Sequence, residues 1–414
     1  MNDDLSSEMP TDEAPLPPGF NPWRGRIFML CLVHMVGTGC YMSVMAMAPV
    51  IRTDLGITAA EFGFFMSCVF GAQLLTALPS GVVTDRMGVG WTLFGATTLT
   101  TIGSACFAMS DSFGPALVSS FVMGLGYSFV NPATAKAVVR WFPAAWRGTA
   151  MGLKQLGVPL GGVLGAGGGV LAAYVDWHYV MWVAASLSFV TALLWLTLTR
   201  KPTAGEGGLK GIVRDMKSVM TNKNLNVICF SCMTYNTAQS SLFAYTSLFL
   251  RDAAMTSQPV AALGVAFVQG ASAIGRLGFS FISDTVFGGR RKGVVVSIIL
   301  AGFVGCMIAY FVNPSWPHWT LLALSAFFGG TIASYAALIL VMSAEAVPPR
   351  LIGSAIGYNA VAWSIGGMLG PPLFGYVLDV TGNNYGLAWV TVGIVMLVGA
   401  TVMWFIHQDP ARAH

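Results

Sequence analysis

The feature that most limits the possible folds is a series of long stretches without a charged residue. Eleven stretches of at least 21 residues contain no Asp, Glu, Lys or Arg, and the longest, 293–344, has 52 residues. A helix needs about 20 mainly apolar residues to cross the hydrocarbon core of a bilayer. The longest stretch therefore holds two spans, separated by NPSWPH at 313–318. With only 9% charged residues, the chain is predicted to be an all-α membrane protein.

The positions of Lys and Arg predict the orientation of these spans. We expect twelve transmembrane helices, at 27–50, 62–83, 88–108, 113–139, 148–174, 178–199, 225–250, 257–283, 293–312, 319–343, 352–378 and 385–407. One side of the membrane then keeps only Arg52 and Arg251, whereas the other side collects most remaining basic residues. Because basic loops stay in the cytoplasm, we expect a multi-pass protein of the bacterial inner membrane with both termini cytoplasmic.

A polar, basic segment at 200–224 divides the chain into two sets of six spans. We expect a disordered cytoplasmic N-terminus at 1–24 and a first six-helix bundle at 25–199. The linker at 200–224 would lead to a second bundle at 225–408 and a cytoplasmic tail at 409–414.

The two halves resemble each other at a nearly constant offset. GVVTDRMG at 81–88 follows the second span, and SFISDTVFGGRRK at 280–292 follows the eighth, which places Asp85 and Asp284 199 residues apart. In FPAAWRGTAMGLKQLGVPLGG at 142–162, the small residues Gly148, Ala150, Gly152, Gly161 and Gly162 recur 205 residues later in VPPRLIGSAIGYNAVAWSIGG at 347–367. Such internal duplication is typical of transporters whose binding site lies between two pseudo-symmetric bundles.

The pattern G-x-x-x-D-R-x-G at Gly81, Asp85, Arg86 and Gly88 resembles the signature of the major facilitator superfamily between helices 2 and 3. The resemblance covers nearly the whole chain. It implies two six-helix bundles around one central cavity, with alternating access and a cytoplasmic gate. The residues expected at this gate are Asp85, Arg86, Arg140, Asp284 and Glu345.

Arg276 is the most informative charge within a span. It lies eight residues before Asp284, about 12 Å from the helix end at 1.5 Å per residue. A charge at that depth costs at least about 2.5–3.5 kcal/mol, so it normally faces a partner or a cavity. Arg276 is either a structural residue bonded to carbonyl groups or a ligand that offers two parallel N–H groups to a carboxylate. The surrounding GRLGFSFISD also resembles the oxalate/formate antiporter and monocarboxylate transporter branches, in which a helix-8 arginine binds the substrate carboxylate.

Other polar residues within the spans are weaker candidates. Lys154 and Lys136 are either further cavity cations or structural and gate residues, and His34 is either a packing residue or a proton carrier. Hydrogen-bonding side chains that could orient a substrate are Tyr127, Asn131, Tyr235, Asn236, Gln239, Tyr358 and Asn359. The seven cysteines all fall within spans, and we expect neither a metal site nor a cofactor.

The middle of each span lacks Asp and Glu, so the interior is positive and favours an anion. We therefore predict a secondary active transporter of small organic anions, either mono- or small dicarboxylates, that works by proton symport or anion exchange. Its partners would be the anion, protons and membrane lipids, with no nucleic acid, and it would be a monomer. The alternatives are an exporter of neutral or amphipathic compounds and an anion receptor that does not transport. No nucleophile elbow, phosphate loop or metal-ligand spacing indicates an enzyme.

Overall fold

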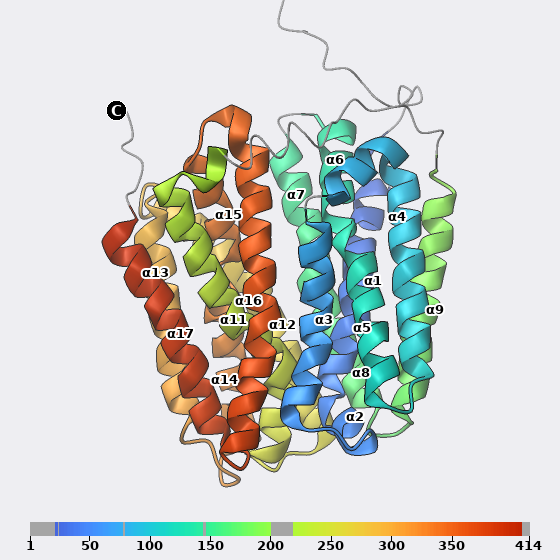
Figure 1. Ribbon diagram of the computed structural model, residues 1–414, viewed down its shortest axis with the longest axis vertical. Helices are drawn as coiled ribbons and strands as arrows, with labels where there is room; N and C mark the ends of the chain where they lie inside the picture. The colour runs from blue at the N-terminus through green and yellow to red at the C-terminus, as the bar shows by residue number, and fades with distance from the viewer. Residues whose placement is uncertain (1–20, 24, 78, 144–145, 200–217, 408–414) are drawn as a thin grey trace, which may run out of the picture.

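The computed structural model describes residues 21–23, 25–77, 79–143, 146–199 and 218–407. Their helices form two bundles that stand side by side (Figure 1). The first contains α1 (Arg26–Ala46), α2 (Ala48–Asp54), α3 (Ala59–Thr76), α4 (Pro79–Ala108), α5 (Phe113–Ser128), α6 (Val130–Trp141), α7 (Arg147–Gln155), α8 (Gly157–Leu171) and α9 (Trp177–Leu196). The second contains α11 (Lys223–Asp252), α12 (Gln258–Thr285), α13 (Arg291–Ala309), α14 (His318–Thr331), α15 (Ala336–Glu345), α16 (Ile352–Val380) and α17 (Tyr385–Ile406).

The predicted fold class, two bundles of six spans, is confirmed. Within the described residues, nine helical segments are long and apolar enough to cross a membrane, some of them combined across a break. The remaining spans are α4, α7 together with α8, and α11, which run beside them in Figure 1. The predicted segments 1–24, 200–224 and 409–414 lie outside the described residues, except for 21–23 and 218–224. Trp23 packs edge-on against Phe142 at a ring distance of 4.8 Å.

Several spans are broken near their middle. α5 and α6 are separated at Phe129, α7 and α8 at Leu156, and α14 and α15 at residues 332–335. The breaks at Phe129 and Ser334 are 205 residues apart, which is the offset of the sequence repeat. A break frees backbone carbonyl groups from helical hydrogen bonds, and at membrane depth such groups must find other partners. These two breaks therefore supply polar backbone groups at equivalent places in the two bundles.

Small residues hold the innermost helices of each bundle together. A Cβ atom on Gly161 of α8 would collide with the carbonyl oxygen of Met35 in α1. A Cβ atom on Gly366 of α16 would collide with the carbonyl oxygen of Met233 in α11. Backbone atoms cannot move aside as a flexible side chain can, so only glycine allows these approaches. The repeated glycines thus fix α8 on α1 and α16 on α11.

We expect Gly161→Ala to lower the melting temperature of the purified protein, because overpacking against a backbone costs about 1–3 kcal/mol. Gly167→Ala is the matched control, since it lies in the same helix and a Cβ there meets nothing within 4 Å. Thermal denaturation of both variants in the same detergent measures the difference. Equal melting temperatures would show that α8 can move away from α1 without loss of stability.

The two bundles meet at the end away from the start of α1 and the end of α17, which we call the far face. Arg52 of α2 forms an ion pair of 3.3 Å with Asp252 of α11. The carboxylate of Asp379 in α16 accepts hydrogen bonds of 3.1 Å from the backbone N–H groups of Ala59 and Ala60, at the start of α3. Gln258 at the start of α12 donates to the carbonyl groups of Ala46 and Gly169. The far face is therefore closed by polar contacts between the bundles.

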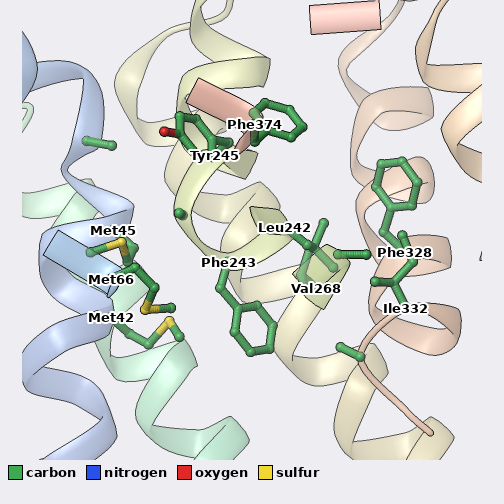
Figure 2. Close-up of a cluster of buried hydrophobic side chains, with 14 of the residues drawn as sticks. Met42, Met45, Met66, Leu242, Phe243, Tyr245, Val268, Phe328, Ile332 and Phe374 are labelled. Carbon is green, nitrogen blue, oxygen red and sulfur yellow. The ribbon is translucent and has the colours of Figure 1, made fainter. Parts of the chain in front are cut away.

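An apolar layer lies beneath these contacts. Figure 2 shows Met42, Met45 and Met66 of the first bundle in one group on the side of Phe243 of α11, whereas Leu242 lies on the other side of that helix, beside Val268. All five side chains are buried, and Met42, Met45, Met66 and Leu242 are at most 1% exposed. Methionine is flexible and fills irregular gaps. The layer therefore excludes water between the far face and the middle of the protein.

Candidate functional site

Arg276 lies in α12 beside the break between α14 and α15. Its Nε donates a hydrogen bond of 3.1 Å to the carbonyl oxygen of Ala333, which also accepts one of 2.8 Å from the Ser272 hydroxyl. The helix break makes this carbonyl available. The two terminal nitrogens of Arg276 have no hydrogen-bond or ion-pair partner among the described residues, and the side chain is only half-buried. The guanidinium group is thus held at one nitrogen and free at the other two.

Tyrosines from both bundles lie within electrostatic range of this guanidinium group. Arg276 interacts electrostatically with Tyr335 of its own bundle and with Tyr41 and Tyr127 of the other. The rings of Tyr41 and Tyr127 lie 5.5 Å apart, and the Thr38 hydroxyl donates to the Tyr127 hydroxyl over 3.1 Å. Arg276 therefore lies within electrostatic range of both bundles, and the binding site of an alternating-access carrier lies between its bundles.

The second bundle also contains buried polar groups that lack a partner, and one of them belongs to Tyr335. Among the described residues, the buried side-chain oxygens of Asn236, Gln239 and Tyr335 have no hydrogen-bond partner. The Asn236 amide nitrogen donates to the Trp363 carbonyl over 2.6 Å, and the Trp363 and Tyr335 rings are 5.9 Å apart. Gln239 lies three residues after Asn236 on α11, on the same face. A buried unsatisfied polar atom is costly, and a ligand could supply the missing hydrogen bonds.

Lys154 forms the centre of a polar cluster in the first bundle. Its Nζ is 2.9 Å from both Asn131 Oδ1 and Thr134 Oγ1, and 3.5 Å from the Asn131 carbonyl oxygen. On the other side of Thr134, the hydroxyl oxygen is 2.9 Å from His34 Nε2. Lys154 and His34 are each 1% exposed, whereas the side chain of Asn131 is exposed. The described residues place no carboxylate in contact with this ammonium group.

Three predicted substrate ligands have other contacts. The Tyr235 hydroxyl donates to the Met403 sulfur of α17, with its ring behind that of Tyr335. Asn359 is buried between α11 and α16, where it interacts with Cys229 and Cys232. Tyr358 is half-buried and packs beside the small apolar cluster around Leu225. These contacts lie within the second bundle, and nothing in them brings the three side chains to Arg276.

Three of the predicted gate residues, Asp85, Asp284 and Glu345, form ion pairs within a single bundle. These pairs lie at the face where α1 begins and α17 ends, here called the terminal face. Lys136, a predicted ligand, pairs with Asp85 over 3.0 Å. Arg291 pairs with Asp284 over 2.8 Å and with Glu345 over 3.0 Å. Arg86 is exposed, and Arg140 lies in the last turn of α6. The ion pairs of Asp85, Asp284 and Glu345 lie within single bundles, whereas the Arg52–Asp252 pair of the far face links the two.

Sequence reasoning missed Thr134, Tyr335 and the Ala333 carbonyl group. Threonine and tyrosine are common in such spans, so residue type alone does not single them out. What these groups share is structural, because Tyr335 and Ala333 lie in the break at residues 332–335 and Thr134 follows the equivalent break at Phe129.

Comparison with known proteins identifies the family. The family model for the Major Facilitator Superfamily matches residues 29–288 and 257–414. The chain belongs to the major facilitator superfamily. It is therefore a multi-pass membrane transport protein and not an enzyme.

This member of the superfamily is similar to bacterial transporters along most of its length. It is 23% identical to a hexuronate transporter of Bacillus subtilis, covering 92% of this chain and 95% of that protein. It is 24% identical to a D-galactonate transporter of Escherichia coli, covering 94% and 97%. A probable sulfoacetate transporter of Cupriavidus necator is 23% identical over 92% of each chain.

Solved structures support the fold of this superfamily member. A bacterial homologue of the human lysosomal transporter Spinster, in an inward-facing and occupied conformation, matches with a TM-score of 0.78 at 16% identity. That match covers 93% of this chain and 97% of the other. The nucleoside transporter NupG matches with a TM-score of 0.75 at 15% identity, covering 92% and 99%.

Proposed function

We propose that the protein is a secondary active transporter of small organic anions that carry a carboxylate and several hydroxyl groups. Arg276 binds the carboxylate between the bundles. The observation that carries this proposal is the pair of free terminal nitrogens on Arg276, fixed through Nε and without an acidic partner among the described residues. A planar fork of N–H donors matches a carboxylate in two parallel hydrogen bonds.

The neighbouring groups fit the rest of such a substrate. The unpaired oxygens of Asn236, Gln239 and Tyr335 accept hydrogen bonds from hydroxyl groups of the substrate. A monocarboxylate without several hydroxyl groups could not donate all of these bonds. Tyr127 receives a hydrogen bond from Thr38, so its own proton is available to a substrate oxygen. The names of two relatives give hexuronate and galactonate as their substrates, and both compounds are polyhydroxy carboxylates.

Access to this site comes from the terminal face in the state described here. The far face is closed by the Arg52–Asp252 pair and the methionine layer, whereas the ion pairs of the terminal face stay within single bundles. We assign the terminal face to the cytoplasm of a bacterial inner membrane, because basic loops gather there. Asp85, Lys136, Asp284, Glu345 and Arg291 then stabilise the cytoplasmic ends of the two bundles.

Thermal stabilisation of the purified protein by a ligand panel tests the function. A ligand that binds the folded state raises its stability by mass action. We expect D-galactonate or D-glucuronate to raise the melting temperature, lactate to raise it less, and D-galactose to leave it unchanged. Counterflow of the stabilising acid in proteoliposomes then distinguishes a carrier from a receptor. Stabilisation by galactose as strong as that by galactonate would contradict the proposal.

A further inference from the structure

The Lys154 cluster contains a buried titratable group that substrate binding at Arg276 does not use. We propose that Lys154 is the proton-coupling group, taking up one proton with each anion and losing it when the anion leaves. This inference rests on the proposed function. It assigns the coupling step to the cluster in the first bundle rather than to a carboxylate.

The two shorter hydrogen bonds of Lys154 satisfy a neutral amine, and the three contacts together satisfy an ammonium ion. A neutral amine has two N–H donors and one lone pair, and Nζ has two acceptors at 2.9 Å, Asn131 Oδ1 and Thr134 Oγ1. The third contact, with the Asn131 carbonyl oxygen, is longer at 3.5 Å. With the site empty, the lone pair can therefore remain without a proton while both N–H groups are satisfied.

The surroundings of Lys154 provide no fixed negative charge. The helices that pack most closely on α7 are α1, α6 and α8. Their titratable or charged side chains are Arg26, Cys31, His34, Cys40 and Tyr41 on α1 and Lys136 and Arg140 on α6, with none on α8. Asp85 on α4 is already paired with Lys136. A buried ammonium ion needs a compensating charge, and an anion held at Arg276 brings one into the interior.

His34 is poorly suited to carry the proton. The Thr134 hydroxyl has a single proton, which it donates to the Val130 carbonyl over 2.7 Å, so it accepts from His34 Nε2–H. His34 Nδ1 is buried without a partner among the described residues. A second proton on the ring would sit on Nδ1 with no acceptor. The ring of His34 thus offers no hydrogen-bonded place for the proton that it would have to carry.

Uptake of radiolabelled D-galactonate into proteoliposomes tests the inference in two steps. Counterflow without a pH difference reports binding and exchange alone, and its absence in the parent protein would count against the proposed function. With counterflow present, a lumen one pH unit more alkaline than the medium should accumulate the label about tenfold, since one proton accompanies each anion. An accumulation ratio of one in the parent protein would overturn the inference in favour of exchange.

Variants of Lys154 and His34 distinguish the roles of these two residues in coupling. We expect Lys154→Gln to show counterflow and no accumulation under the pH difference, and His34→Gln, which keeps a donor to Thr134, to accumulate about tenfold like the parent. Accumulation by Lys154→Gln would overturn the assignment. Lys154→Arg carries a permanent charge and should also lose accumulation. If the glutamine variant does not fold, a folded arginine variant still tests the assignment. Loss of coupling in His34→Gln but not in Lys154→Gln would return the role to His34.

Discussion

Arg276→Ala should abolish the stabilisation of the protein by D-galactonate, with an affinity loss of at least about 100-fold. Hydrogen bonds to charged groups contribute roughly 1.5–3 kcal/mol each, and alanine removes both free terminal nitrogens. Each 1.4 kcal/mol corresponds to a tenfold change in affinity. Thermal shift across a concentration series of galactonate measures the change.

Two controls make the Arg276 result specific. Arg290→Ala removes an exposed arginine of the same bundle and should leave the galactonate response unchanged. Arg276→Lys keeps the positive charge but loses the planar pair of donors, so it should bind more weakly than the parent and better than Arg276→Ala. An Arg276→Ala variant that still responds like the parent would make this arginine a structural residue.

Asp379→Ala should open the far face. It removes two charge-assisted hydrogen bonds that join α16 to the first turn of α3, and with them the favourable position of a carboxylate at a helix N-terminus. A loss of roughly 1.5–3 kcal/mol changes the ratio of open to closed populations by about 10- to 100-fold. The distance between spin labels at the exposed residues Thr53 and Met255, in a background without native cysteines, should lengthen.

Asp54→Ala is the control for the far face. Asp54 also lies at this end of the protein, but its carboxylate accepts from Trp177 of the same bundle over 3.0 Å. Its loss should leave the label distance between bundles unchanged. An equal response in both variants would mean that the far face opens through general destabilisation rather than through the bond from α16 to α3.

The sequence was sufficient to predict the fold, and it singled out Arg276 as the first candidate for a substrate ligand. Charge-free stretches and the internal repeat predict two six-span bundles because the bilayer imposes length and polarity on every span. Arg276 stood out because a buried charge is rare and costly. The site around it was harder to predict. Tyr235 and Asn236 are neighbours on α11, yet the structure directs one toward Met403 and the other toward Trp363.

Helix rotation and breaks explain the remaining differences. Lys136 and Lys154 are both cations near the middle of the first half, but one reaches Asp85 and the other reaches Asn131 and Thr134. A shift of one turn along a helix decides between these partners, and periodicity alone does not fix it. The Ala333 carbonyl group that holds Arg276 depends on a backbone break, which leaves no mark in residue type.

The lack of an acidic partner for Arg276 determines how the carrier responds to membrane voltage. In the proposed cycle, the protein without substrate changes from one access state to the other with a single positive charge, that of Arg276, in its interior. The loaded protein carries that charge, a protonated Lys154 and a monovalent anion, so its net charge is the same. Moving one charge through 100 mV involves about 2.3 kcal/mol, and this work cancels between the loaded and empty steps. An electrical potential would therefore not drive accumulation, and cells could concentrate the substrate only to the extent of their pH difference.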